Sequence, residues 1–124
     1  MIYEYPVLGI REVHDGDTYR LDLDVGFEHS AWPWLRLKDF SAPELKQKGG
    51  TDSKVYAQSE LTEALLTTGI WVRTFKRKGY EDMSKSFARY LAEVYLGDFE
   101  ARSGDLLGER LVAAGLAQRG AFEG

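Results

Sequence analysis

A run of alternating apolar and polar residues limits what this chain can fold into more than any other feature. In residues 18–25, every second side chain is apolar (Tyr, Leu, Leu, Val), and the side chains between them are polar. A period of two is typical of a β-strand with one buried face. Residues 15–17, Asp-Gly-Asp, favour a tight bend before this strand. Because residues 5–13 are rich in Val, Ile and Tyr, a second strand is predicted on the other side of the bend.

The order of the remaining elements predicts the fold class. The predicted elements are, in order, strands at residues 5–13, 18–25 and 32–40, a helix from Asp52 or Ser53 to about 67, strands at 70–75 and 87–96, and a helix from Ser103 or Asp105 to 114. Three meandering strands, a helix, two strands and a helix suggest an α+β fold that is mainly β. We expect a five-stranded Greek-key barrel of the OB type with flanking helices.

The first predicted helix begins at Asp52 or Ser53 because either side chain can cap a helix N-terminus. Its apolar stripe would contain Val55, Leu61, Ala64 and Leu65. Residues 26–30, before the third strand, are predicted to form a loop.

Composition narrows the class of protein. With 124 residues, 44% hydrophobic and 29% charged, the chain is expected to be a single globular domain spanning residues 1–124. It has no run of 18 apolar residues and no basic residue before Arg11, so neither a membrane span nor a signal peptide is predicted. A cytoplasmic location is one expectation, and export stays open as the alternative. The absence of Cys and the presence of only two His exclude a disulfide framework and disfavour a zinc site. Any bound metal should therefore be a hard cation held by oxygens.

Charge is unevenly distributed along the chain. The net charge is −4, but residues 45–89 contain nine basic and five acidic residues, whereas both flanks are acidic. A basic middle segment suits an anionic partner at one place. The alternative, that these are ordinary solvated side chains, is equally open from charge alone. The basic run at residues 73–78 favours contact with a phosphate backbone.

Four features form a chemically coherent set. Each is weak alone, since Asp-Gly-Asp is commonly a plain turn and a strand Arg is commonly a surface residue. Together they offer carboxylates for a hard cation, a further carboxylate for a water, and two guanidinium groups that can bind a phosphate. The four features are the Asp15-Gly16-Asp17-Thr18 segment, Arg36, the Ala42-Pro43-Glu44 segment and Arg89.

These residues lie in stretches that resemble the staphylococcal nuclease (thermonuclease) family. The stretches occur in the family's order and cover about residues 8–122, and eight positions separate Arg36 from Glu44, as in the family. Residues 24–27 also resemble the sequence after the second strand in phage-type members. The matching stretches are residues 13–18 (VHDGDT), 35–37 (LRL), 41–44 (SAPE), 87–92 (FARYLA) and 111–117 (LVAAGLA).

The resemblance implies a calcium-dependent phosphodiesterase. It implies that Asp17 and the backbone carbonyl of Ala42 bind the metal, and that Glu44 activates the attacking water. Arg36 and Arg89 would grip the phosphate and stabilise its charge in the transition state. The products would have 3′-phosphate and 5′-hydroxyl ends.

Further roles follow from the same resemblance. Asp15 would orient Asp17, with Thr18 also next to the metal ligands. Basic residues in and after the run at 73–78, and one aromatic residue, are also expected to contact the nucleic acid. The nucleic-acid contacts expected are Lys76, Arg77, Lys78, Lys85 and Phe87.

One departure from the family concerns the metal. Ser41 occupies a position where the family usually has Asp, a second charged calcium ligand. Ser41 can offer a neutral oxygen, and Asp39, two residues earlier with the same strand parity, is an alternative source of charge. We expect one calcium ion, weakly bound without substrate.

The sequence leaves a choice of functions open. The first is a monomeric nuclease that acts on DNA, with RNA open as a second substrate. The second is a catalytically weak or inactive OB module that only binds nucleic acid, and the third is a structural or assembly part. The survival of Arg36, Glu44 and Arg89 favours the enzyme. Trp32 and Trp34 are more typical of packing or edge residues than of stacking platforms.

Overall fold

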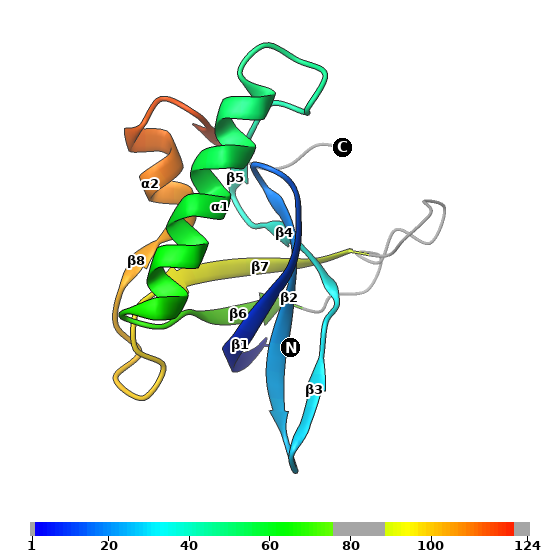
Figure 1. Cartoon of the computed structure of the whole chain (residues 1–124), viewed down its shortest axis with the longest axis vertical. Helices are drawn as coiled ribbons and strands as arrows, with labels where there is room; N and C mark the ends of the chain where they lie inside the picture. The colour runs from blue at the N-terminus through cyan, green and yellow to red at the C-terminus, as the bar shows by residue number, and fades with distance from the viewer. Residues whose placement is uncertain (1, 76–88, 121–124) are drawn as a thin grey trace.

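The computed structural model describes residues 2–75 and 89–120, which form a β-barrel with two helices beside it (Figure 1). The nine strands and two helices of this part are β1 (Ile2–Asp15), β2 (Thr18–Gly26), β3 (His29–Ala31), β4 (Trp34–Leu37), β5 (Phe40–Ser41), α1 (Gly50–Leu66), β6 (Trp71–Phe75), β7 (Arg89–Leu96), β8 (Asp105–Leu106), α2 (Leu107–Ala113) and β9 (Gln118–Arg119).

Five strands close the barrel. Strand β1 pairs antiparallel with both β2 and β6, and β6 pairs antiparallel with β7. Strand β7 pairs parallel with β4, which pairs antiparallel with β2 and completes the ring. Strands β5 and β9 form a separate two-stranded ribbon. The predicted α+β barrel of the OB type is therefore confirmed.

The alternation in β2 determines which side chains fill the barrel. Tyr19, Leu21 and Leu23 are buried, as the period of two predicts. They pack in one core with apolar residues from the other strands and from both helices, including Leu61 and Leu111. The side chains between them on β2 point out of the barrel, where functional groups can lie.

The predicted third strand is wrong in its extent. Residues 32–40 form two short strands, β4 and β5, because the backbone turns at Asp39, whose φ is 68°. Residues 29 and 30, predicted to be loop, belong to β3 (His29–Ala31), which forms a hairpin with β2. The interruption at Asp39 lets residues 40–42 fold back over the end of the barrel.

The predicted helix boundaries also need correction. Helix α1 begins at Gly50 after Gly49, whose φ is 85°, and no side chain caps its N-terminus. Ser53 is instead fully buried on the packed face, whereas Val55, predicted to lie in the apolar stripe, is 60% exposed. Helix α2 begins at Leu107, again without a side-chain cap, because the two residues before it form β8.

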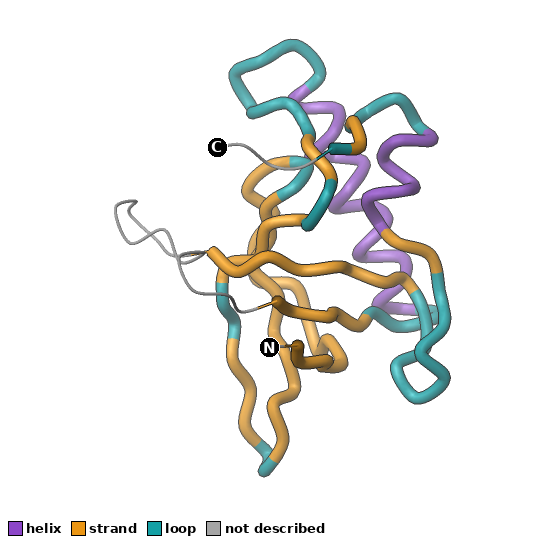
Figure 2. Tube along the Cα trace, turned by 180° about the vertical axis from the view of Figure 1, so that it is seen from behind, coloured by secondary structure: helices purple, strands orange, loops and turns teal. Residues whose placement is uncertain are grey.

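The helices leave one side of the barrel open. Helices α1 and α2 contact each other and lie on the same side, and the β2–β3 hairpin extends away from them (Figures 1 and 2). Among the described residues, no helix is long and apolar enough to cross a membrane.

Candidate functional site

Two buried carboxylates lie in the bend between β1 and β2. Asp15 and Asp17 are each less than one tenth exposed. The backbone N–H of Asp17 donates to Asp15 Oδ1 at 3.1 Å, and the Tyr19 hydroxyl donates to the Gly16 carbonyl. These bonds fix the bend and hold Asp17 at the end of the barrel.

Gly16 allows two other segments to approach this bend. A Cβ atom at Gly16 would lie 1.9 Å from Ser53 Oγ on α1 and 2.8 Å from Ala42 Cβ. Both distances are far shorter than van der Waals contact, so a larger residue would push α1 and residue 42 away. The glycine of the Asp-Gly-Asp segment therefore has a packing role as well as a turn role.

The Asp17 carboxylate accepts bonds from three elements. Its Oδ2 accepts the backbone N–H of Ala42 at 2.8 Å and lies 3.4 Å from Arg36 Nη2. Its Oδ1 accepts the Thr18 hydroxyl at 3.2 Å. Burial, together with the interaction with Asp15, raises the pKa of Asp17 to about 6, although Arg36 and the Ala42 amide act in the opposite direction. The negative charge at this position is thus incompletely compensated by the protein.

Arg36 is a buried cation anchored by carbonyl oxygens. It is 3% exposed, and its Nη1 donates to the carbonyls of Leu37 at 2.9 Å and Phe40 at 2.7 Å. Its Nη2 faces Asp17 and the Ser41 hydroxyl, each at 3.4 Å. Burial lowers the pKa of Arg36, with Asp17 opposing this effect and Arg89 adding to it. Two bonds of the guanidinium thus go to backbone carbonyls, which fix its orientation, and the Asp17 carboxylate lies beside it.

Arg89 begins β7 next to this cluster. Arg89 is half-buried and pairs in register with Trp34 of β4. Trp34 in turn lies two residues before Arg36 on the same strand. The electrostatic effect of Arg89 on Arg36 also indicates that the two guanidinium groups are near each other. The two arginines named from the sequence are therefore brought to the same end of the barrel.

Ser41 and Asp39 are placed differently. Ser41 lies in β5 against Arg36, within the cluster. The carboxylate of Asp39 is 61% exposed and pairs with Lys38 at 2.7 Å rather than with the Asp17 group. The equal strand parity that favoured Asp39 is broken by the backbone turn at Asp39 itself.

Glu44 lies on an exposed loop beside the cluster. Its backbone N–H donates to Gln47 Oε1 at 2.9 Å, and its carbonyl accepts the Gln47 N–H at 2.9 Å. A Cβ atom at Gly50 would lie 2.0 Å from the Glu44 carbonyl oxygen, so the start of α1 packs directly on this turn. The backbone of Glu44 is thus held firmly, while its side chain is exposed to solvent.

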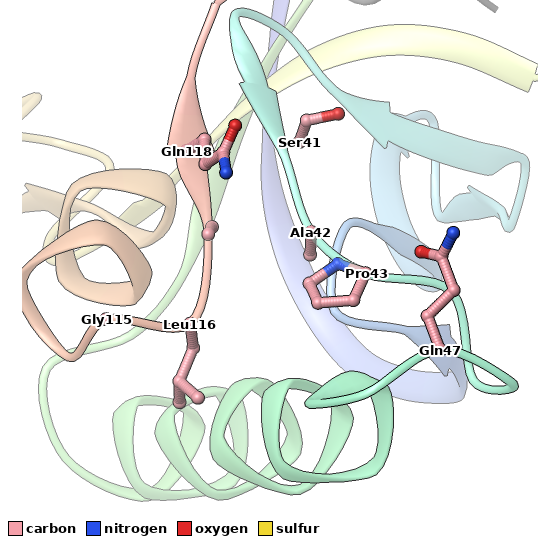
Figure 3. Close-up of a pocket in the computed structure, with 8 residues that line it drawn as sticks. Ser41, Ala42, Pro43, Gln47, Gly115, Leu116 and Gln118 are labelled. Carbon is pink, nitrogen blue, oxygen red and sulfur yellow. The ribbon is translucent and has the colours of Figure 1, made fainter.

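A pocket of about 310 Å³ opens next to Ser41 and Ala42 (Figure 3). One wall consists of Pro43 and Gln47 from the loop before α1, and the other of residues 115–118. Figure 3 shows these two walls facing each other, with α1 running below both. The pocket lies at the cluster and is large enough for a small polar ligand.

Oxygen atoms dominate the groups that could hold a metal. Among residues 2–75 and 89–120, no three His, Asp or Glu side chains gather as a ready metal cluster. The donors present are the Asp17 carboxylate, the Ser41 hydroxyl and backbone carbonyls such as that of Ala42. This set suits a hard cation and not a soft one, and its low charge suits weak binding.

The five residues named for contact with nucleic acid lie in the undescribed segment 76–88. They are Lys76, Arg77, Lys78, Lys85 and Phe87, and they stay predictions.

Sequence reasoning missed the residues that brace the site. Ser53 Oγ donates to the Leu116 carbonyl at 3.1 Å and ties α1 to the segment after α2. A Cβ at Gly108 would lie 2.2 Å from the Phe40 ring, which shows how closely α2 approaches β5. Gln47 fixes the backbone of Glu44. The only sequence signals for these residues are small size or a polar side chain, and neither is specific.

No protein-family model matches the chain, and no curated protein matches it.

Proposed function

We propose that this protein is a calcium-dependent phosphodiesterase that hydrolyses nucleic acid at the cluster of Asp17, Arg36, Glu44 and Arg89. The observation that supports this most is the state of Arg36. A buried guanidinium held in one orientation by the Leu37 and Phe40 carbonyls, beside the Asp17 carboxylate, is a preorganised cation for an anionic ligand. A phosphodiester is an anion that gains charge in the transition state, which is what a preorganised cation stabilises.

Calcium fits the oxygen donors next to Arg36. Asp17, with Ser41 and the Ala42 carbonyl, would hold the ion. The raised pKa of Asp17 supports this, since a buried carboxylate that is incompletely compensated favours a nearby cation. Bound calcium supplies positive charge that a phosphate oxygen can meet.

The remaining chemistry belongs to side chains. The Glu44 carboxylate takes a proton from a water as its oxygen bonds to phosphorus. Arg36 and Arg89 hold the phosphate oxygens and stabilise the added charge. The bond to the 5′ oxygen breaks, and that oxygen takes a proton from solvent. The products have 3′-phosphate and 5′-hydroxyl ends, and DNA is the first substrate to test, with RNA as the second.

A binding module without hydrolysis is the second candidate. The observation that favours it is the neutral Ser41 beside a single carboxylate, Asp17. With so few charged ligands, the metal could be held too weakly for turnover, while the arginines would still bind phosphates.

Digestion of nucleic acid separates the two candidates. Single- and double-stranded DNA and RNA are incubated with calcium, magnesium, manganese or a chelator, and acid-soluble nucleotides and product ends are measured. We expect calcium-dependent release with 3′-phosphate ends. In Glu44→Gln, which keeps the shape and removes the charge, turnover should fall steeply while calcium binding changes little. The matched control is Glu63→Gln, an exposed glutamate on α1. Full activity in chelator, or in Glu44→Gln, would contradict the mechanism.

A further inference from the structure

Two tryptophans and two arginines alternate on the outer face of the barrel. The Arg11 guanidinium carbon lies 4.1 Å from the Trp32 ring centroid, and that of Arg20 lies 5.3 Å from the Trp34 ring centroid. Arg20 Nε also donates to the Trp32 carbonyl at 2.8 Å. We call Arg11, Trp32, Arg20 and Trp34 the tryptophan–arginine face. The two tryptophan rings of this face contact arginine side chains and are not among the buried core residues.

The tryptophan–arginine face is continuous with the candidate site. In the pairing of β2 with β4, Arg20 lies opposite Trp34, and Thr18 lies opposite Arg36. Residues two apart on a strand point to the same side, so Trp34 and Arg36 share one side of β4. On the other edge of β4, Arg89 is the partner of Trp34. A chain bound at Arg36 and Arg89 can therefore pass directly onto Trp34 and then Trp32.

Exposure and ring contacts indicate the kind of chain that fits. Trp32 is 40% exposed, unlike Trp71, the third tryptophan, which is 1% exposed. Each arginine of the face has a carboxylate nearby, Asp22 paired with Arg11 at 2.7 Å and Glu12 opposite Arg20, so the face is close to neutral. A bound strand would therefore be held there by stacking on the rings more than by charge.

We propose that the tryptophan–arginine face binds the bases and backbone of a single-stranded nucleic acid whose phosphodiester lies at the candidate site. This inference rests on the proposed function, because the strand that binds the face is the same substrate whose phosphodiester lies at the cluster. Aromatic rings and arginines can stack only on bases whose faces are accessible, and a duplex hides those faces. The face therefore selects a single strand over a duplex, for DNA and RNA alike.

Binding in chelator tests the face without hydrolysis. A labelled oligothymidylate and a duplex of equal length are titrated into the full chain with chelator, and fluorescence anisotropy and tryptophan quenching are recorded. We expect Trp32→Leu to raise the Kd for the single strand at least about fivefold, since base–aromatic stacking contributes about 1–3 kcal/mol per base. Trp32→Phe, which keeps a ring, should retain most of the affinity, and duplex binding should change little in both variants. Circular dichroism checks that each variant is folded.

The matched control is Phe27→Leu. Phe27 is 94% exposed at the tip of the β2–β3 hairpin, away from the face. Trp71, being buried, serves as an internal fluorescence reference. Unchanged single-strand binding in Trp32→Leu, or an equal loss in Phe27→Leu, overturns the proposal.

Failure of this proposal can be told from failure of the proposed function. A dinucleotide is too short to reach from the cluster across the face, so its cleavage in calcium depends on the cluster alone. Suppose that wild type and Trp32→Leu cleave the dinucleotide at equal rates and bind the single strand with the same Kd. This result would reject binding at the tryptophan–arginine face and support the proposed enzyme. If wild type does not cleave the dinucleotide but Trp32→Leu raises the single-strand Kd, the proposed enzyme is rejected and binding at the tryptophan–arginine face is supported.

Discussion

Arg36 and Arg73 both lie on strands of the barrel, Arg36 buried and Arg73 partly exposed. The charged groups around them differ. Arg73 Nε pairs with Glu4 at 2.9 Å, and its Nη1 pairs with Glu93 at 3.1 Å. Arg36 Nη2 lies 3.4 Å from the Asp17 carboxylate, and its Nη1 donates to the backbone carbonyls of Leu37 at 2.9 Å and Phe40 at 2.7 Å. The hydrogen bond that Arg73 donates to Glu4 is the main reason that the pKa of Arg73 is raised, whereas burial lowers the pKa of Arg36.

The difference separates two kinds of arginine. The charge of Arg73 is paired with two carboxylates, and Arg73 helps to cover Trp71, whose ring stacks on Tyr95 at 4.1 Å. Arg36 is oriented by backbone carbonyls, with Asp17 beside it. On the proposed function, we expect Arg36 to meet the phosphate and Arg73 to belong to the scaffold.

The largest expected effect is on turnover. Arg36→Lys keeps one charge but loses the planar, multi-donor geometry, so we expect hydrolysis to fall by about 10²–10³-fold, as when one transition-state donor is lost. Arg73→Lys should change turnover less than about twofold. Initial rates of calcium-dependent DNA hydrolysis check both. Arg36→Ala is less informative, because it leaves two buried carbonyls without their donor and would also destabilise the fold.

Similar effects of Arg36→Lys and Arg73→Lys on turnover would contradict the comparison. Arg89→Ala offers a second test, since Arg89 is expected to contact the same phosphate and its loss should cost at least about 10² in rate.

Asp17 predicts a loss of stability as pH rises, opposite in sign to that expected from Glu4 in the Arg73 cluster, whose pKa is lowered by its hydrogen bonds with Arg102 and Arg73. The pKa of Asp17 is raised from 3.8 to about 6, so the folded protein holds this proton more tightly than the unfolded chain. The stability that the proton confers is full below about pH 4 and is lost as pH rises through about 6, by up to about 3 kcal/mol. Urea unfolding between pH 4 and 8 should show this loss in wild type and not in Asp17→Asn.

The control for this titration is Asp52→Asn, an exposed carboxylate on α1. It should leave the pH dependence as in wild type. A pH dependence that is the same in Asp17→Asn and wild type would show that another group causes it.

The sequence predicted the barrel because the relevant signals are local. The alternation in β2 and the Asp-Gly bend depend on neighbouring residues, and Tyr19, Leu21 and Leu23 are buried as expected. It did not predict the start of α1, because Gly49 and Gly50 use backbone conformation and close packing in place of a side-chain cap.

Much of the candidate site depends on contacts between distant residues. Asp17 and Ala42 are 25 residues apart, and Ser53 and Leu116 are 63 apart. The sequence named Asp17, Arg36 and Ser41 as candidate site residues, and the structure brings these three together. It could not predict that Asp39 turns away, because that follows from a positive φ at Asp39 itself.

A smaller effect is expected on metal affinity. Calcium should bind weakly without substrate, at about 10⁻⁴–10⁻³ M, because the ligands include few charges. Ser41→Asp adds a carboxylate beside Asp17 and should tighten calcium by about tenfold, or about 1.4 kcal/mol. Ser59→Asp, an exposed position on α1, is the control. Calorimetric titration with and without a nucleotide bisphosphate measures both, and Asp17→Ala should abolish binding.

Tight calcium binding by the unmodified protein, or no gain in Ser41→Asp, would show that another group already completes the metal site.

The smallest expected effect concerns Arg73 itself. Arg73→Met keeps the apolar stem over Trp71 and removes the charge, leaving Glu4 with Arg102, whose Nε lies 3.0 Å away. Because partly exposed ion pairs contribute little, we expect the free energy of unfolding to fall by no more than about 1 kcal/mol, with DNA hydrolysis unchanged. Urea denaturation and initial rates measure these two quantities. A tenfold loss of hydrolysis in Arg73→Met would mean that Arg36 and Arg73 share a function. Pairing with carboxylates would then not distinguish a structural arginine from one in the site.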